Sequence, residues 1–271
     1  MRSFQTVRYE IESDKIARGD VVTLAFLSDL HGHDHGEEDL CTAIREEKPD
    51  LVLCGGDMIL RVDPSSFAIS LGIVKNLCRD FSLYLGLGNH EATLEKGRAK
   101  GKHAKEMLEG YPGYAKELEE AGVVTLRNET AEVMVRGTAL RITGLDMPLE
   151  HYKKPFPPSF SLSQMEDLVG EGPKGEGPLH ILLAHNPYFA RTYFSWGADV
   201  TLSGHYHGGV WRLGERSIIA SPYFHPFPRY GVGDFHEGGH HLFVSPGLGE
   251  HSIPLRICNP RELFIICVRG A

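Results

Sequence analysis

The chain has 271 residues, a length that suits one large domain or two small ones. Its content of 41% hydrophobic and 24% charged residues is ordinary for a globular protein, and its net charge of −8 disfavours stable, sequence-independent binding to nucleic acid. No apolar run approaches the roughly 20 residues that span a bilayer, and the polar, alternating N-terminus does not resemble a secretory signal, so we expect a cytoplasmic protein.

The first half of the sequence predicts strands that alternate with helices. Each predicted strand is a short apolar run, and the helices begin with acids or a proline, as the first helical turn favours. The predicted strands cover 21–27, 50–54 and 82–85; the predicted helices cover 37–48 and 64–79, followed by a helical region over 91–121 that breaks at Gly110–Gly113.

The second half is richer in predicted strands. These cover 123–126, 131–135, 139–144, 180–184, 199–202, 216–220, 241–245 and 262–268, with helices over 162–169 and near 187–195. A hairpin over 136–138 joins two of the strands. The order predicts an α/β fold of four layers (α/β/β/α), in which two mixed sheets face each other and helices flank them. No linker divides the chain, so we expect one domain over residues 1–271.

Five of the apolar runs end in potential metal ligands. The carboxyl ends of strands in an open α/β sheet converge on one crevice, so these residues could meet there. Any single pair is better explained as polar residues in a loop, but five such ends together favour a metal site. The runs end in Asp29 and His31, in Asp57, in Asn89 with His90, in His185, and in His205 with His207.

The residue types and their spacing indicate which metals would bind. Asp29 and His31 are two residues apart, as are His205 and His207, and in extended backbone this spacing directs both side chains to one side. Carboxylate, imidazole and amide ligands suit Mn, Fe or Zn. Seven donors are too many for one tetrahedral ion, and they fit two ions that share a carboxylate.

In these motifs the sequence resembles the calcineurin-like metallophosphoesterase superfamily. The blocks DLH (29–31), GDMI (56–59), GNHE (88–91), a lone histidine at 185 and GHYH (204–207) occur in the family's order. The resemblance implies the two-sheet sandwich described above. It also implies a mechanism in which a metal-activated hydroxide attacks phosphorus.

The resemblance further implies a role for each matched residue. Asp57 would bridge the two metals, and His90 would not bind a metal but would stabilise or protonate the leaving oxygen. Asp29, His31 and His207 would hold the first metal, and Asn89, His185 and His205 the second.

The finer pattern is similar to a bacterial subgroup of small phosphodiesterases, which includes hydrolases of UDP-diacylglucosamine. Tyr206 stands inside the GHYH motif where threonine is common in that subgroup, so we expect it to shape the pocket. His225 and Arg229 lie on a long Gly-, Pro- and aromatic-rich stretch, and we expect one of them to reach the substrate.

The basic run at 96, 98, 100, 102 and 105 is either a solvated surface or a means of attracting an anionic substrate. We expect a hydrolase of phosphodiester, phosphomonoester or pyrophosphate bonds in small or lipid-linked esters. The alternatives are a non-catalytic metal-binding scaffold of the same fold and a dimetal nuclease. The sequence leaves the oligomeric state open.

Overall fold

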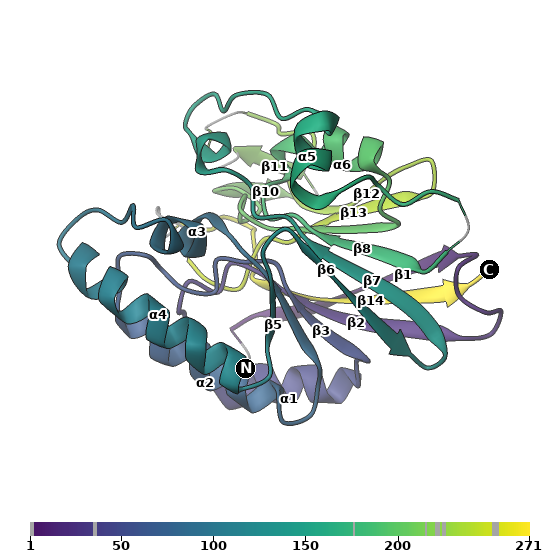
Figure 1. Cartoon of the computed structure of the whole chain (residues 1–271), viewed down its shortest axis with the longest axis horizontal. Coiled ribbons are helices and arrows are strands. Elements are labelled where there is room, and N and C mark those ends of the chain that lie inside the picture. The colour runs from purple at the N-terminus through teal and green to yellow at the C-terminus, as the bar shows by residue number, and fades with distance from the viewer. Residues whose placement is uncertain are drawn as a thin grey trace.

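The computed structural model describes residues 3–34, 37–175, 177–214, 216–219, 223, 226–250 and 255–271. Two six-stranded sheets face each other, and helices cover the outer face of each sheet (Figure 1). The predicted four-layer α/β/β/α sandwich is confirmed. Among the helices of the described residues, none is both long and apolar enough to cross a membrane.

The first sheet has the strand order β1-β14-β2-β3-β4-β5. The strand β14 runs antiparallel to β2 and parallel to the edge strand β1, and the other neighbours are parallel, so the sheet is mixed. Its strands are β1 (Gln5–Ser13), β2 (Val21–Leu27), β3 (Leu51–Cys54), β4 (Leu83–Gly86), β5 (Val124–Leu126) and β14 (Glu262–Gly270).

The second sheet has the order β12-β13-β9-β8-β7-β6, and β10 and β11 form a separate two-stranded sheet. The predicted hairpin over 136–138 is confirmed, since β6 and β7 are antiparallel and pair as far as Val135 and Thr138. These strands are β6 (Glu129–Val135), β7 (Thr138–Gly144), β8 (Leu179–Leu183), β9 (Val200–Ser203), β10 (Trp211–Leu213), β11 (Arg216–Ile219), β12 (Gly233–Glu237) and β13 (His240–Val244).

The central strands are apolar on both faces because each face is covered. In β2, Leu24 and Phe26 point into the core between the sheets, whereas Ala25 and Leu27 pack under the helices. Full burial of one such large side chain contributes about 1.5–3 kcal/mol. Helices α1 (Glu37–Glu47), α2 (Ser65–Leu77) and α4 (Ala104–Glu120) cover the first sheet, and α5 (Leu162–Val169) and α6 (Ala190–Trp196) cover the second (Figure 1).

The helical region predicted over 91–121 differs from the structure. It forms a short helix, α3 (Asn89–Glu95), and then α4, which continues through Pro112 without the predicted break. Pro112 removes one backbone hydrogen bond. The helix tolerates this loss because Met107, Tyr111 and Tyr114 bury their side chains against the core.

Candidate metal centre

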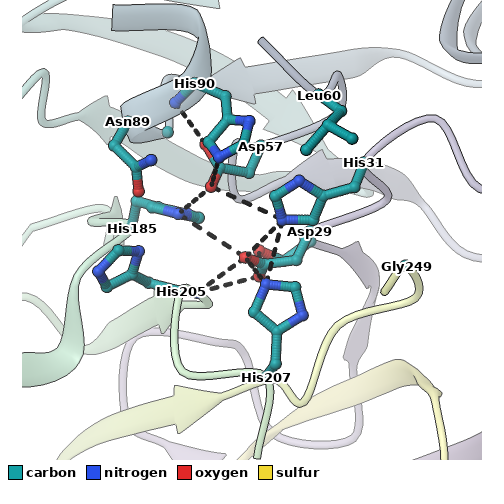
Figure 2. Close-up of polar contacts among 12 residues, drawn as sticks. Asp29, His31, Asp57, Leu60, Asn89, His90, His185, His205, His207 and Gly249 are labelled. Carbon is teal, nitrogen blue, oxygen red and sulfur yellow. Dashed lines mark hydrogen bonds and ion pairs between the residues drawn. The ribbon is translucent and has the colours of Figure 1, made fainter. Parts of the chain in front are cut away.

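Loops that follow five strands, drawn from both sheets, meet at one edge of the sandwich. Each of the strands β2, β3, β4, β8 and β9 ends within four residues of a side chain in this cluster. Figure 2 shows that the side chains point toward one another from these separate loops. The residues that meet are Asp29, His31, Asp57, Asn89, His90, His185, His205 and His207.

The first group in the cluster consists of Asp29, His31 and His207. Their candidate ligand atoms lie within 4.8 Å of one another. Nε2 of His207 lies 3.2 Å from Oδ1 of Asp29, and Nε2 of His31 lies 3.8 Å from the same oxygen. The two Nε2 atoms are 3.1 Å apart. One cation could therefore be held by all three side chains.

The second group consists of Asp57, His185 and His205, which satisfy the same 4.8 Å limit. Nε2 of His185 lies 3.1 Å from Oδ2 of Asp57. The side-chain oxygen of Asn89 points toward His185 in Figure 2. This group therefore has donors for a second cation.

The two groups are contiguous because both carboxylates lie between them. Oδ2 of Asp57 is 3.8 Å from Nε2 of His31, a member of the first group. Oδ1 of Asp29 is 3.7 Å from Nε2 of His185, a member of the second. The geometry is thus suited to a carboxylate that is shared by two ions.

The backbone at the cluster is strained. Non-glycine residues avoid positive φ, at a cost of roughly 1–2 kcal/mol each, and such residues concentrate at functional sites. The expected extended backbone at the paired ligands is therefore wrong: their side chains converge because the backbone enters the left-handed region. Five cluster residues have φ between 50° and 65°, namely Asp29, His31, Asp57, His205 and His207.

Hydrogen bonds hold the Asp29 carboxylate in position. The backbone N–H of His205 lies 3.0 Å from both of its oxygens, and the Ser28 hydroxyl donates to Oδ2 at 2.6 Å. The Asp29 N–H donates to the carbonyl of Gly56, and its carbonyl accepts from Gly249. The loops after β2, β3 and β9 are therefore tied to one another through Asp29.

Glu91 holds the backbone beside the cluster, a role that was not predicted from the sequence. Its side chain is fully buried, and its two oxygens accept backbone N–H groups of Gly88, Asp57, Met58 and Ile59 at 2.7–3.3 Å. This carboxylate therefore fixes the backbone that carries Asp57. The available signal was an acid at the last position of the GNHE block.

The ring of His90 has a defined orientation. Its Nδ1 accepts the backbone N–H of Arg61 at 3.0 Å, so the proton of the neutral ring resides on Nε2. Nε2 lies 4.0 Å from Oδ2 of Asp57. Burial lowers the pKa of His90 to about 3, against the opposing effect of Asp57, so the ring is neutral at pH 7. His90 therefore presents an N–H donor toward the cluster.

Several buried polar atoms indicate that the cluster fits cations. Oδ1 of Asn89, Nε2 of His185 and Nε2 of His205 are buried, and no group in the described part of the chain donates a hydrogen bond to them. Nδ1 of His185 lies 2.7 Å from the carbonyl oxygen of Gly55 and must donate to it, which leaves Nε2 as a ligand atom once the ring is neutral. Bound cations would satisfy these atoms.

The pKa shifts of the cluster residues are also consistent with cation binding. Burial by itself would raise the pKa of Asp29 and Asp57, but neighbouring histidines hold both pKa values well below the usual range. Burial opposes the charged form of His185, yet the two carboxylates raise its pKa to about 10. A cation would take the place of this proton, because an imidazole must be neutral to bind metal.

Three further residues were expected to bind substrate. Tyr206 is only 4% exposed, and its ring centroid lies 6.2 Å from that of His205. Arg229 is exposed and sits over the ring of Tyr230 at 5.2 Å. His225 lies outside the described residues. Substrate contacts by these three remain predictions.

The basic run that begins at residue 96 is mostly solvated or paired. Lys96 forms an ion pair with Asp146, and Lys105 lies 3.8 Å from Glu109. The side chains of Lys100 and Lys102 are exposed. Attraction of an anionic substrate by this run stays a prediction.

Comparison with known proteins supports the identification of the motifs. The model for the calcineurin-like phosphoesterase family matches residues 22–209. The uncharacterized metallophosphoesterase YkuE of Bacillus subtilis is 26% identical, over 98% of this chain and 86% of its own length. The phosphodiesterase YaeI of Escherichia coli is 26% identical, over 76% of this chain and 65% of its own.

Two solved structures are similar to this chain over most of its length. The protein TT1561 of Thermus thermophilus covers 85% of this chain and 92% of its own, with 11% identity and a TM-score of 0.49. The phosphopantetheinyl hydrolase PptH of Mycobacterium tuberculosis covers 83% of this chain and 89% of its own, with 15% identity and a TM-score of 0.46.

Proposed function

Because the chain belongs to the calcineurin-like phosphoesterase family and is a metal-dependent phosphoester hydrolase, we propose that two cations act together in its centre. Small-molecule or lipid-linked phosphate esters are the proposed substrates. When bound, the cations would lower the pKa of water and neutralise phosphoryl oxygens. The observation that carries this proposal is the presence of two contiguous ligand groups with both carboxylates between them.

Each side chain has a proposed role. Asp57 would be shared by the two ions, for which manganese, iron and zinc are the candidates. Its backbone is held by Glu91, so the shared ligand needs little reorganisation when metal binds. Asp29, His31 and His207 would hold the first ion, and Asn89, His185 and His205 the second.

His90 is the proposed hydrogen-bond donor to the leaving oxygen. It also lies within ligand distance of His31 and Asp57, which would be compatible with metal binding. We assign it to the leaving group instead, because Arg61 fixes its tautomer and leaves Nε2–H directed at the cluster. A positioned donor of this kind stabilises charge that develops on the leaving oxygen.

An activity screen tests the proposal. The protein is reconstituted separately with manganese, iron and zinc and assayed against bis-p-nitrophenyl phosphate and p-nitrophenyl phosphate. We expect turnover that disappears on chelation and returns on metal addition. Asp57→Ala should lose both metal and turnover.

The same screen addresses the alternatives. A non-catalytic scaffold would bind metal without turning over any ester, and a nuclease would cleave a single-stranded oligonucleotide faster than the small esters. A full complement of metal in Asp57→Ala would contradict the role of Asp57 as the shared ligand.

A further inference from the structure

We propose that Tyr152 is a positioning residue of the centre, whose ring holds the imidazole of His205 in the orientation that the second cation requires. This inference rests on the proposed function, in which His205 is a ligand of that cation. It goes further because it names a side chain outside the ligand set that would control the affinity for one ion of the pair.

The ring of His205 is held differently from that of its neighbour His185. Nδ1 of His185 donates to the carbonyl oxygen of Gly55 at 2.7 Å, and a bond of this kind normally orients a metal-binding imidazole. In the described part of the chain, no group forms a hydrogen bond with either ring nitrogen of His205. The bonds from His205 to Asp29 come from its backbone N–H and do not restrain the ring. Packing must therefore orient this imidazole.

Aromatic rings surround the imidazole of His205. The ring centroid of Tyr152 lies 5.1 Å from that of His205 at an interplanar angle of 75°, the edge-to-face arrangement that aromatic pairs prefer. The rings of Tyr223 and Tyr206 are farther away, at 5.7 Å and 6.2 Å. The ring of Tyr152 also lies 6.3 Å from that of His185. Tyr152 is thus the tyrosine that packs most closely against the histidines of the second group.

The backbone that carries Tyr152 is anchored. Tyr152 is the last residue of the 3₁₀ helix η1 (Leu149–Tyr152). The residue before it, His151, is only 4% exposed, and its carbonyl oxygen accepts hydrogen bonds from Nδ2 of Asn186 and from the Tyr223 hydroxyl, each at 3.2 Å. Asn186 belongs to the loop after β8, which also carries a histidine of the second group. The end of η1 is therefore fixed relative to that group.

A ring in this position would act on metal affinity through the ligand. An imidazole that is already oriented loses less conformational freedom when it binds an ion. Removal of a group that orients a metal ligand typically lowers metal affinity about 10- to 100-fold. The first group of ligands lies in other loops, and within the described chain its rings make no contact with Tyr152. The effect should therefore fall on the second ion alone.

Calorimetric titration of the metal-free protein with manganese tests the inference without relying on turnover. We expect the wild type to bind two ions, and Tyr152→Ala to bind the second about 10- to 100-fold more weakly while the first keeps its affinity within about twofold. The electron paramagnetic resonance signal of a spin-coupled manganese pair should follow the second ion. It should be absent from Tyr152→Ala at the manganese concentration that loads both sites of the wild type.

Two variants serve as controls. Tyr152→Phe keeps the ring and should restore the second affinity and the coupled signal to within about twofold of the wild type. Lys153→Ala, at the exposed position that follows, should behave as the wild type.

The outcomes separate the inference from the proposed function. Two ions in the wild type with unchanged binding in Tyr152→Ala would overturn only the role of Tyr152. Equal weakening of both ions, or a loss in Tyr152→Phe as large as that in Tyr152→Ala, would overturn it as well, because the first would indicate a general disturbance and the second a role of the hydroxyl. A wild type that binds a single ion would overturn the two-ion function and this inference together.

Discussion

Gly88→Ala should disable the centre without changing any ligand. A Cβ at position 88 would lie 2.2 Å from Oδ1 and 2.4 Å from the backbone nitrogen of Asp57, where ordinary contact needs 3.4–4 Å. The φ of Gly88 is −94°, so alanine is conformationally acceptable and the effect is purely steric. Either Asp57 or the turn at 88 must therefore move by about 1 Å, at a cost of about 1–3 kcal/mol.

Asp57 cannot move away cheaply. Its N–H is held by Glu91 at 2.9 Å, and its carbonyl accepts the N–H of His31 at 3.0 Å. A misplacement of about 1 Å can lower turnover about 100-fold. We expect a loss of that order for bis-p-nitrophenyl phosphate, together with less bound metal by elemental analysis.

Gly113→Ala is the matched control for this substitution. Among the described residues, nothing lies within 4 Å of a Cβ at this position of α4, so the variant should keep wild-type turnover and gain about 0.5–1 kcal/mol of stability. If Gly88→Ala matched Gly113→Ala in turnover and metal content, the argument that Asp57 is rigidly held would fail.

Three further predictions concern single side chains. Glu91→Ala leaves four buried N–H groups without an acceptor, at a cost of about 1–3 kcal/mol each, and this cost outweighs the gain from removing a buried charge. In urea unfolding, the free energy of unfolding should fall by at least about 3 kcal/mol relative to Glu119→Ala, a substitution of an exposed residue. A fall of less than about 1 kcal/mol would contradict the structural role of Glu91. His90→Ala should keep its metals by elemental analysis while turnover falls about 10²- to 10⁴-fold; loss of metal would make His90 a ligand. Burial, and to a smaller extent the charge of Arg141, lower the pKa of His180 to about 4 in the folded state, whereas its value in the unfolded chain is about 6.5. The folded state therefore disfavours protonation of His180, and stability falls as the pH drops below about 6.5. Between pH 8 and pH 5 the wild type should lose about 1–2 kcal/mol more than His180→Gln in urea unfolding, and parallel curves would refute this.

The sequence predicted the layers well because the buried strands are apolar on both faces. It missed β1, whose alternation of polar and apolar residues over Gln5–Ser13 is the pattern of an edge strand with one buried face. Pro112 and its flanking glycines indicated a break that tertiary packing overrides. The signal for β1 was therefore present in the sequence, whereas the continuity of α4 through Pro112 depends on core residues that are distant in the chain.

The site was predictable to the extent that its residues follow strands. The convergence of the Asp, His and Asn side chains could be inferred from strand ends. The positive φ at Asp57 and the four N–H bonds to Glu91 could not, because they arise from the packing of separate loops. Arg61 was missed for the same reason, since its backbone, not its side chain, contacts His90.

Anomalous diffraction from crystals soaked in manganese tests the central claim most directly. We expect two peaks about 3.5–4 Å apart. One should lie among Asp29, His31 and His207, and the other among Asn89, His185 and His205, with the carboxylate of Asp57 touching both. A single peak, or peaks outside these groups, would contradict the two-metal account.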